Sequence, residues 1–131
     1  MQKQISLFFS LFFSFVFTYA QVVFIVDAIP NNTPANAAIH VAGNFNTWNP
    51  GNSNYILQAM GQGRYSIEIN GISANQSLEY KFTRGSWPTV EGNANGNVRP
   101  NRTFTASSNR DTVYHQILSW EDLGGSGGGA S

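Results

Sequence analysis

Two stretches of strict alternation between apolar and polar residues constrain the fold of this chain more than any other feature. Across residues 65–70 and again across 78–83, every second side chain is apolar and those between are polar. Successive side chains of a β-strand point to opposite faces, so the pattern predicts strands with one buried and one solvent-facing side. In the second stretch, Tyr80 and Phe82 fall on the buried side and Lys81 on the polar side.

Further short strands are predicted on both sides of these two. Turn clusters of Gly, Asn and Pro separate apolar or β-branched runs at 22–26, 38–42, 56–60, 103–105 and 112–118. No segment has a convincing helical period. About seven short strands at regular spacing predict an all-β fold, an immunoglobulin-like antiparallel β-sandwich.

The first twenty residues are predicted to be a cleaved secretory signal peptide. A positively charged start precedes an apolar run from 5 to 17 and small residues up to Ala20. The alternative is a membrane anchor, but the run is shorter than the ~20 residues that span a bilayer. We expect a secreted chain, extracellular or periplasmic, cleaved between Ala20 and Gln21. Residues 21–122 are then predicted to form the sandwich, and the Gly- and Ser-rich residues 123–131 a flexible tail or linker.

The composition narrows the classes of partner. With no cysteine, the domain is expected to depend on core packing alone, and thiol catalysis and cysteine-ligated metals are excluded. The 7 Lys and Arg residues balance 7 Asp and Glu residues. Nucleic acids and acidic membranes need a basic patch, so neither is an expected partner. An amide-rich, nearly neutral surface suits a neutral partner.

Three tryptophans differ in their local context. Trp48 precedes Asn49-Pro50-Gly51, a turn, which favours a surface position. Trp87 precedes a proline, so Ser86-Trp87-Pro88 is expected to be extended, and this context fits a core or a binding position equally. Trp120 lies near the end of the predicted sandwich and is expected to close its edge.

Three motifs occur in a distinctive order: Gly43-Asn44-Phe45-Asn46-Thr47-Trp48, then Tyr80-Lys81-Phe82 followed by Trp87, then Pro100-Asn101-Arg102. Their order and spacing resemble the starch-binding domains of carbohydrate-binding module family 20 and the related glycogen-binding family 48. The chain also resembles domains in front of secreted bacterial hydrolases. The resemblance implies a non-catalytic module that binds α-glucan, a starch- or glycogen-type polysaccharide or oligosaccharide, beside a C-terminal catalytic domain.

The resemblance also implies which residues form the sugar site. In these families the residues matching Trp48 and Trp87 stack on glucose rings, and those matching Lys81 and Asn101 hydrogen-bond to sugar hydroxyls. The chain departs from family 20 in one place, because the loop from 92 to 100 is enlarged and separates Trp87 from Asn101. Only Tyr65 lies near a matching place for that family's second sugar site, so we expect the second site to be absent.

These side chains have the chemistry that a sugar requires. An indole covers the C–H face of a glucose ring and loses little side-chain entropy. Two indoles at an angle match a curved α-1,4-glucan better than flat cellulose. A hydrogen bond from Lys81 replaces one to water and contributes only ~1 kcal/mol, so weak affinity is expected, raised by tethering to an enzyme.

No catalytic or metal site is predicted, and we expect a non-enzymatic protein without a cofactor. Glycoside hydrolysis usually needs two carboxyl groups, and Glu91 is the only acidic residue in a loop near the candidate site. The one Gly-x-Ser-x-Gly match, 124–128, lies in the tail, where no strand and helix flank it. His40 and His115 lie in separate strand patterns and are expected to be satisfied or surface residues.

Two alternatives remain open. Lys81 is most simply a solvated strand residue, paired across the sheet with Glu68. The whole chain is alternatively a structural or interaction sandwich that packs on a neighbouring catalytic domain without binding sugar. The position of Trp48 and Trp87 distinguishes these interpretations, since sugar stacking requires both indoles to be exposed on one face beside Lys81.

Overall fold

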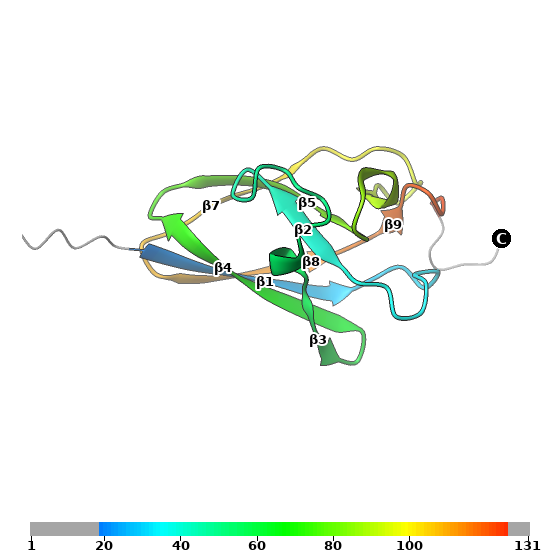
Figure 1. Cartoon of the computed structure of the whole chain (residues 1–131), viewed down its shortest axis with the longest axis horizontal. Helices are drawn as coiled ribbons and strands as arrows, with labels where there is room; N and C mark the ends of the chain where they lie inside the picture. The colour runs from blue at the N-terminus through cyan, green and yellow to red at the C-terminus, as the bar shows by residue number, and fades with distance from the viewer. Residues whose placement is uncertain (1–18, 126–131) are drawn as a thin grey trace, which may run out of the picture.

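A computed structural model describes residues 19–125, which form an all-β sandwich of two facing sheets (Figure 1). One sheet has the strand order β3-β4-β1-β8 and the other has the order β2-β5-β7. A short pair, β6 and β9, lies toward one end of the molecule. The predicted all-β sandwich is confirmed, with one departure from the antiparallel expectation, the parallel pairing of β1 and β8. Residues 1–18 of the predicted signal peptide and 126–131 of the predicted tail lie outside the described residues.

The strands within residues 19–125 are β1 (Tyr19–Ala28), β2 (His40–Gly43), β3 (Gln58–Gly61), β4 (Arg64–Ser73), β5 (Ser77–Thr83), β6 (Glu91–Gly92), β7 (Arg102–Thr105), β8 (Arg110–Gln116) and β9 (Ser119–Trp120). Two 3₁₀ helices of three residues each, η1 (Ser53–Tyr55) and η2 (Trp87–Thr89), lie in the loops. The seven longer strands correspond to the seven predicted ones. No helix in the described part of the chain has the length and apolar character to cross a membrane.

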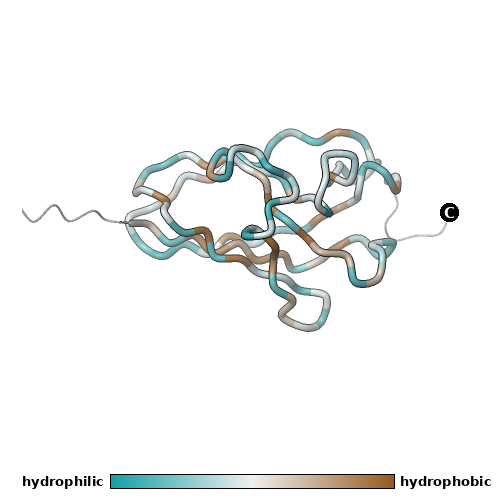
Figure 2. Tube along the Cα trace, viewed as in Figure 1, coloured by the Kyte–Doolittle hydropathy of each residue, from teal (hydrophilic) through white to brown (hydrophobic). Residues whose placement is uncertain are grey.

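The alternation in β5 builds the core as predicted. Leu78, Tyr80 and Phe82 point inward and are almost completely buried. The Tyr80 ring stacks on Phe24 of β1 in the opposite sheet, with ring centroids 4.3 Å apart. Burying one such side chain contributes about 1.5–3 kcal/mol. Figure 2 shows the hydrophobic segments along the facing strands and mainly polar residues in the loops at the ends.

In β4 the alternation holds as far as Ile69 and then shifts. Ile69 is buried, and the next buried side chain is Ile72, three residues further on. The pairing of β1 with β4 changes register between Ala20 and Val22, which marks a β-bulge with one extra residue in β4. The bulge therefore returns Ile72 to the core.

The first long strand and the last one lie side by side. β1 pairs in parallel with β8, from Gln21 opposite Arg110 to Ala28 opposite Gln116. On its other side, β1 pairs antiparallel with β4. β1 is therefore an interior strand of its sheet, and residues from both ends of the described chain complete that sheet.

A histidine in the core has partners on both ring nitrogens. His115 Nε2 lies 2.6 Å from the Tyr80 hydroxyl oxygen, and His115 Nδ1 lies 3.2 Å from the carbonyl oxygen of Ile25. Burial lowers the pKa of His115 to about 4 and raises the pKa of Tyr80 to about 12. Both side chains are therefore neutral near pH 7, and the expectation of a satisfied histidine is confirmed for His115.

Trp120 closes one end of the sandwich. Its side chain is fully buried, and its indole N–H donates to the Thr33 hydroxyl oxygen at 2.8 Å. The Arg84 guanidinium lies over the indole, 5.2 Å from the ring centroid, and also pairs with Asp122. The predicted structural role of Trp120 is confirmed.

Candidate functional site

Two of the four candidate site residues, Lys81 and Asn101, lie on or directly beside the β2-β5-β7 sheet. Lys81 points outward from β5 and is half-buried beside Ala42 of β2. Continuing the β5–β7 register by one step places Asn101, an exposed residue just before β7, on the other side of Lys81. The predicted pairing of Lys81 with Glu68 is wrong, because Glu68 lies in the other sheet, 3.8 Å from Arg110.

Trp48 is held by a tight turn that follows β2. The Gly43 N–H donates to Asn46 Oδ1 at 2.9 Å, the Asn46 side-chain amide donates to Val41 O at 3.0 Å, and the Trp48 N–H donates to Gly43 O at 2.9 Å. Thr47 and Trp48 both have a φ of 56°, the left-handed region that bulky residues avoid. Each such residue costs about 1–3 kcal/mol, so the surrounding turn must hold Trp48 in place.

Trp87 begins η2, and here the predicted conformation is wrong. Ser86 is extended, as expected, but 87–89 form a 3₁₀ helix instead of continuing the extended chain. The Thr89 N–H donates to Ser86 O and the Val90 N–H donates to Trp87 O, both at 3.1 Å. These bonds outweigh the preference of a residue before proline for an extended conformation. The turn leaves the Trp87 side chain 42% exposed.

The two indoles lie next to each other although they come from separate loops. The Trp48 and Trp87 ring centroids are 6.3 Å apart, and the ring planes are inclined by 39°. Trp48 is half-buried and Trp87 is more open. We call this pair the indole platform. The sequence left the position of Trp87 open between core and site, and the structure places it with Trp48.

A buried hydroxyl joins the two loops that carry the platform. Thr83 Oγ1 donates to Pro50 O at 2.6 Å and accepts from the Gly85 N–H at 3.0 Å. A Cβ atom on Gly51 would lie only 2.6 Å from Gly85 O, so the two backbones touch there. The alternation places Thr83 on the polar face, yet it is fully buried because these loops cover it. Sequence reasoning missed this contact, for which the only signal was a glycine near each tryptophan.

His40 lies under the same loops. A Cβ atom on Gly85 would lie 3.4 Å from His40 Cε1. Burial lowers the pKa of His40, against a smaller opposite effect of the Ala38 backbone. Its Nδ1 atom makes no hydrogen bond of normal geometry within residues 19–125. His40 is therefore not a surface residue, because it is buried where the loop after β5 packs against it.

Glu91 is a structural carboxylate at the base of the enlarged loop. It is fully buried and accepts from the Phe82 N–H at 2.8 Å, from Arg102 at 2.8 and 2.9 Å, and from Arg99 at 3.4 Å. The two arginines anchor the far end of the 92–100 loop to its beginning. Among the described residues, no three His, Asp or Glu side chains gather as a metal site.

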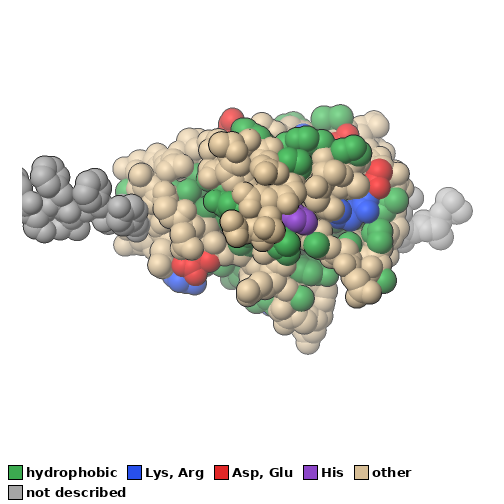
Figure 3. Space-filling view, in the orientation of Figure 1, with side chains coloured by type: hydrophobic (Ala, Val, Ile, Leu, Met, Phe, Trp, Pro, Cys, Tyr) green, Lys and Arg blue, Asp and Glu red, His purple; other side chains and the backbone are tan. Residues whose placement is uncertain are grey.

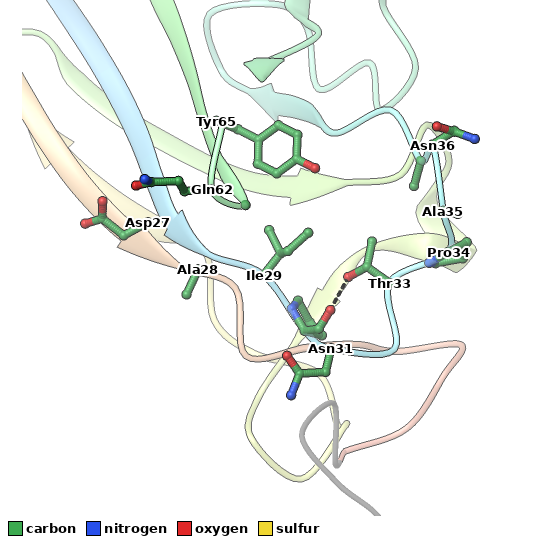
Figure 4. Close-up of a pocket in the computed structure, with 13 residues that line it drawn as sticks. Asp27, Ala28, Ile29, Asn31, Thr33, Pro34, Ala35, Asn36, Gln62 and Tyr65 are labelled. Atoms are coloured by element: carbon green, nitrogen blue, oxygen red, sulfur yellow. Dashed lines mark hydrogen bonds between the residues drawn. The ribbon is translucent and has the colours of Figure 1, made fainter. Parts of the chain in front are cut away.

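A separate hollow of about 490 Å³ lies between the loop 29–37 and the turn from β3 to β4 (Figure 4). Tyr65, Ile29, Asn31 and Asn36 are among the residues that line it. Tyr65 is the only aromatic side chain among its described lining residues. The four predicted sugar-site residues lie outside this hollow.

The face of the molecule shown in Figure 3 carries few charged side chains among many neutral ones. This observation agrees with the nearly neutral surface that the composition indicates.

Comparison with known proteins finds similarity to small parts of large amylolytic enzymes. The chain is 40% identical over 95 residues to an alpha-amylase of Niallia circulans, covering 72% of this chain and 7% of that enzyme. It is 37% identical over 100 residues to an amylopullulanase of Thermoanaerobacter thermohydrosulfuricus, covering 72% of this chain and 6% of that enzyme. An amylopullulanase of Thermoanaerobacterium thermosulfurigenes is 32% identical over 109 residues, again over 6% of its length. No protein-family profile matches the chain.

Proposed function

We propose that residues 21–122 form a non-catalytic module that binds α-glucan for a larger amylolytic hydrolase. The observation that carries the proposal is the indole platform, two tryptophans from separate loops whose rings lie 6.3 Å apart at 39°. The large relatives, named alpha-amylase and amylopullulanase, support a starch-type ligand and a tethered catalytic domain. In the same proposal, Lys81 on β5 and Asn101 just before β7 supply the polar groups of the sugar site.

In this proposal the two indoles cover the C–H faces of neighbouring glucose units. Their inclination follows the curvature of an α-1,4-linked chain, whereas a flat β-linked glucan requires coplanar rings. Lys81 and Asn101 hydrogen-bond to sugar hydroxyls, and each bond contributes ~1 kcal/mol after exchange with water. The affinity is weak, and tethering to the catalytic domain raises the effective concentration of the polysaccharide.

The module acts outside the cytoplasm in this proposal, after cleavage near Ala20. The cleavage position falls inside β1, where Ala20 is buried and lies opposite Ile72. Cleavage there shortens β1 by two residues and leaves the pairs from Val22 onward intact. Binding requires no cofactor, metal, membrane or nucleic acid.

Affinity electrophoresis in starch or glycogen gels tests the proposal. We expect retardation of the wild-type domain relative to a gel without polysaccharide, and loss of that retardation in Trp48→Ala. Tyr114→Ala is the matched control, because Tyr114 is an aromatic residue 62% exposed on β8 of the other sheet. Equal wild-type mobility with and without polysaccharide would reject α-glucan binding.

A titration with β-cyclodextrin, followed by tryptophan fluorescence, tests both indoles together. We expect a saturable change in emission that Trp48→Phe and Trp87→Phe each abolish. A change that persists in both variants would assign binding elsewhere.

One alternative function has an observation in its favour. Tyr114, Leu118 and Leu123 are apolar side chains between 39% and 62% exposed, as expected for a domain that packs on a neighbouring catalytic domain. A sandwich of this kind would show no retardation in starch gels. Its isolated form would instead bind the catalytic domain, and Tyr114→Ala would weaken that binding.

A further inference from the structure

The two halves of the indole platform meet at one buried side chain. Thr83 Oγ1 donates to Pro50 O and accepts from the Gly85 N–H, at 2.6 and 3.0 Å. Pro50 lies two residues after Trp48, and Gly85 lies two residues before Trp87. A single hydroxyl therefore connects both loops within two residues of each indole.

The surroundings of Thr83 make this connection rigid. Thr83 is fully buried at the end of β5, where its backbone is fixed opposite His40 of β2. Gly51 and Gly85 are in contact beside it, leaving no space for a Cβ atom on Gly51. The hydrogen bonds within each loop fix that loop's own shape, but the Thr83 hydroxyl and the Gly51–Gly85 contact fix one loop against the other.

We infer that Thr83 is a positioning residue that sets the distance and inclination between Trp48 and Trp87. The inference about geometry stands on the contacts alone, and its consequence for sugar binding rests on the proposed function. A preorganised pair of indoles loses less freedom when a ligand binds, so fixing the loops raises affinity. The residue is expected to act without touching the sugar, because the loops cover it.

Circular dichroism of the free domain tests the geometry. Two indoles this close couple their electronic transitions and give a paired positive and negative band in the far ultraviolet. Loss of that band in Trp48→Phe and in Trp87→Phe assigns it to the platform. We expect Thr83→Val, which keeps the shape but removes the hydroxyl, to weaken the band strongly, and Thr83→Ser to retain it. An unchanged band in Thr83→Val would overturn the inference.

A second variant separates positioning from stability. Gly51→Ala leaves Thr83 intact but places a methyl group 2.6 Å from Gly85 O, so the loops must move apart. We expect this variant to weaken the band as well, and it decides the question if Thr83→Val does not fold. A band of wild-type strength in folded Gly51→Ala would contradict the role of the loop contact.

The sugar measurement follows from the same variants. We expect β-cyclodextrin to bind Thr83→Val about tenfold more weakly than the wild type, and Thr83→Ser to bind within about twofold. Wild-type affinity in a Thr83→Val protein that has lost the band would overturn the link between geometry and binding. Absence of wild-type binding would reject the proposed function, whereas the band would still decide the role of Thr83.

Discussion

The aromatic core and the indole platform use similar side chains in opposite ways. Each region combines aromatic rings with a strand histidine, His115 of β8 in the core and His40 of β2 near the platform. In the core, His115 has partners on both ring nitrogens, and Trp120 donates its N–H to Thr33. In the platform, Trp87 is 42% exposed, and the Nδ1 atom of His40, near Gly85 of the same loop, makes no hydrogen bond of normal geometry within the described residues.

The difference shows what each region contributes. A buried polar group without a partner costs about 1–3 kcal/mol, so a region that serves stability satisfies its polar atoms. The platform instead keeps one indole partly exposed, at Trp87, and two consecutive left-handed residues, Thr47 and Trp48, which reduce stability. Strained residues of this kind often occur at functional sites, which agrees with the proposed role of the platform. Left-handed residues also occur in turns elsewhere, at Asn36, Gln62 and Asn75.

The largest expected effect is on Trp120. Trp120→Ala should lower the free energy of unfolding by about 3–5 kcal/mol, because it removes a fully buried indole and leaves a cavity. Urea unfolding followed by far-ultraviolet circular dichroism measures the change. If Trp48→Ala lowered the free energy of unfolding by the same amount, Trp48 would be as important for stability as the core, and the two regions would not differ in this way.

The core histidine should make stability depend on pH. Since the pKa of His115 is lowered from 6.5 to about 4, the folded protein binds fewer protons than the unfolded chain between these values. Stability is therefore complete above pH 6.5 and falls, by up to about 3 kcal/mol, as the pH drops to about 4. Urea midpoints measured across this range should show the fall in the wild type.

The control is His115→Gln, which cannot titrate. We expect its stability to be lower at pH 7 but to change less between pH 6.5 and 4 than that of the wild type. Parallel curves for the two proteins would show that other groups cause the pH dependence.

The smallest expected effect on stability is at Trp87. Because its side chain is 42% exposed, Trp87→Ala should change the free energy of unfolding by less than about 1 kcal/mol. Acrylamide quenching of tryptophan fluorescence sharpens the comparison. Trp87→Phe should remove much of the quenchable emission, whereas Trp120→Phe should leave it. If Trp120→Phe removed the quenchable emission and Trp87→Phe did not, the accessible indole would be Trp120, and the comparison of core and platform would be wrong.

The strands could be predicted because their pattern is local. Alternation along β5 identifies Tyr80 and Phe82 as core residues and Lys81 as outward-facing, and the structure agrees. The two-residue strands β6 and β9 were missed, because a pair this short has no period to detect. Their position depends on contacts between distant segments.

The site was only partly predictable for the same reason. The motif resemblance named Trp48, Lys81, Trp87 and Asn101, and the structure brings the two indoles together while leaving sugar contact a prediction. The hydroxyl of Thr83 was missed, because a threonine on the polar side of a strand is expected to meet solvent. Thr83 is buried only because the loops that carry Trp48 and Trp87 fold over it, and that arrangement cannot be read from the strand pattern.

The parallel pairing of β1 with β8 has a consequence for how fast the domain folds. The side chains of Gln21 and Arg110, which meet at one end of this pairing, are 89 residues apart in the chain. Closing so long a segment loses conformational entropy before any contact compensates for it, and such topologies fold in milliseconds to seconds. The second edge of β1 also stays unpaired until β8, the last long strand, has joined the sheet. We expect this edge, and not the exposed platform, to be where the newly made chain is most prone to aggregate.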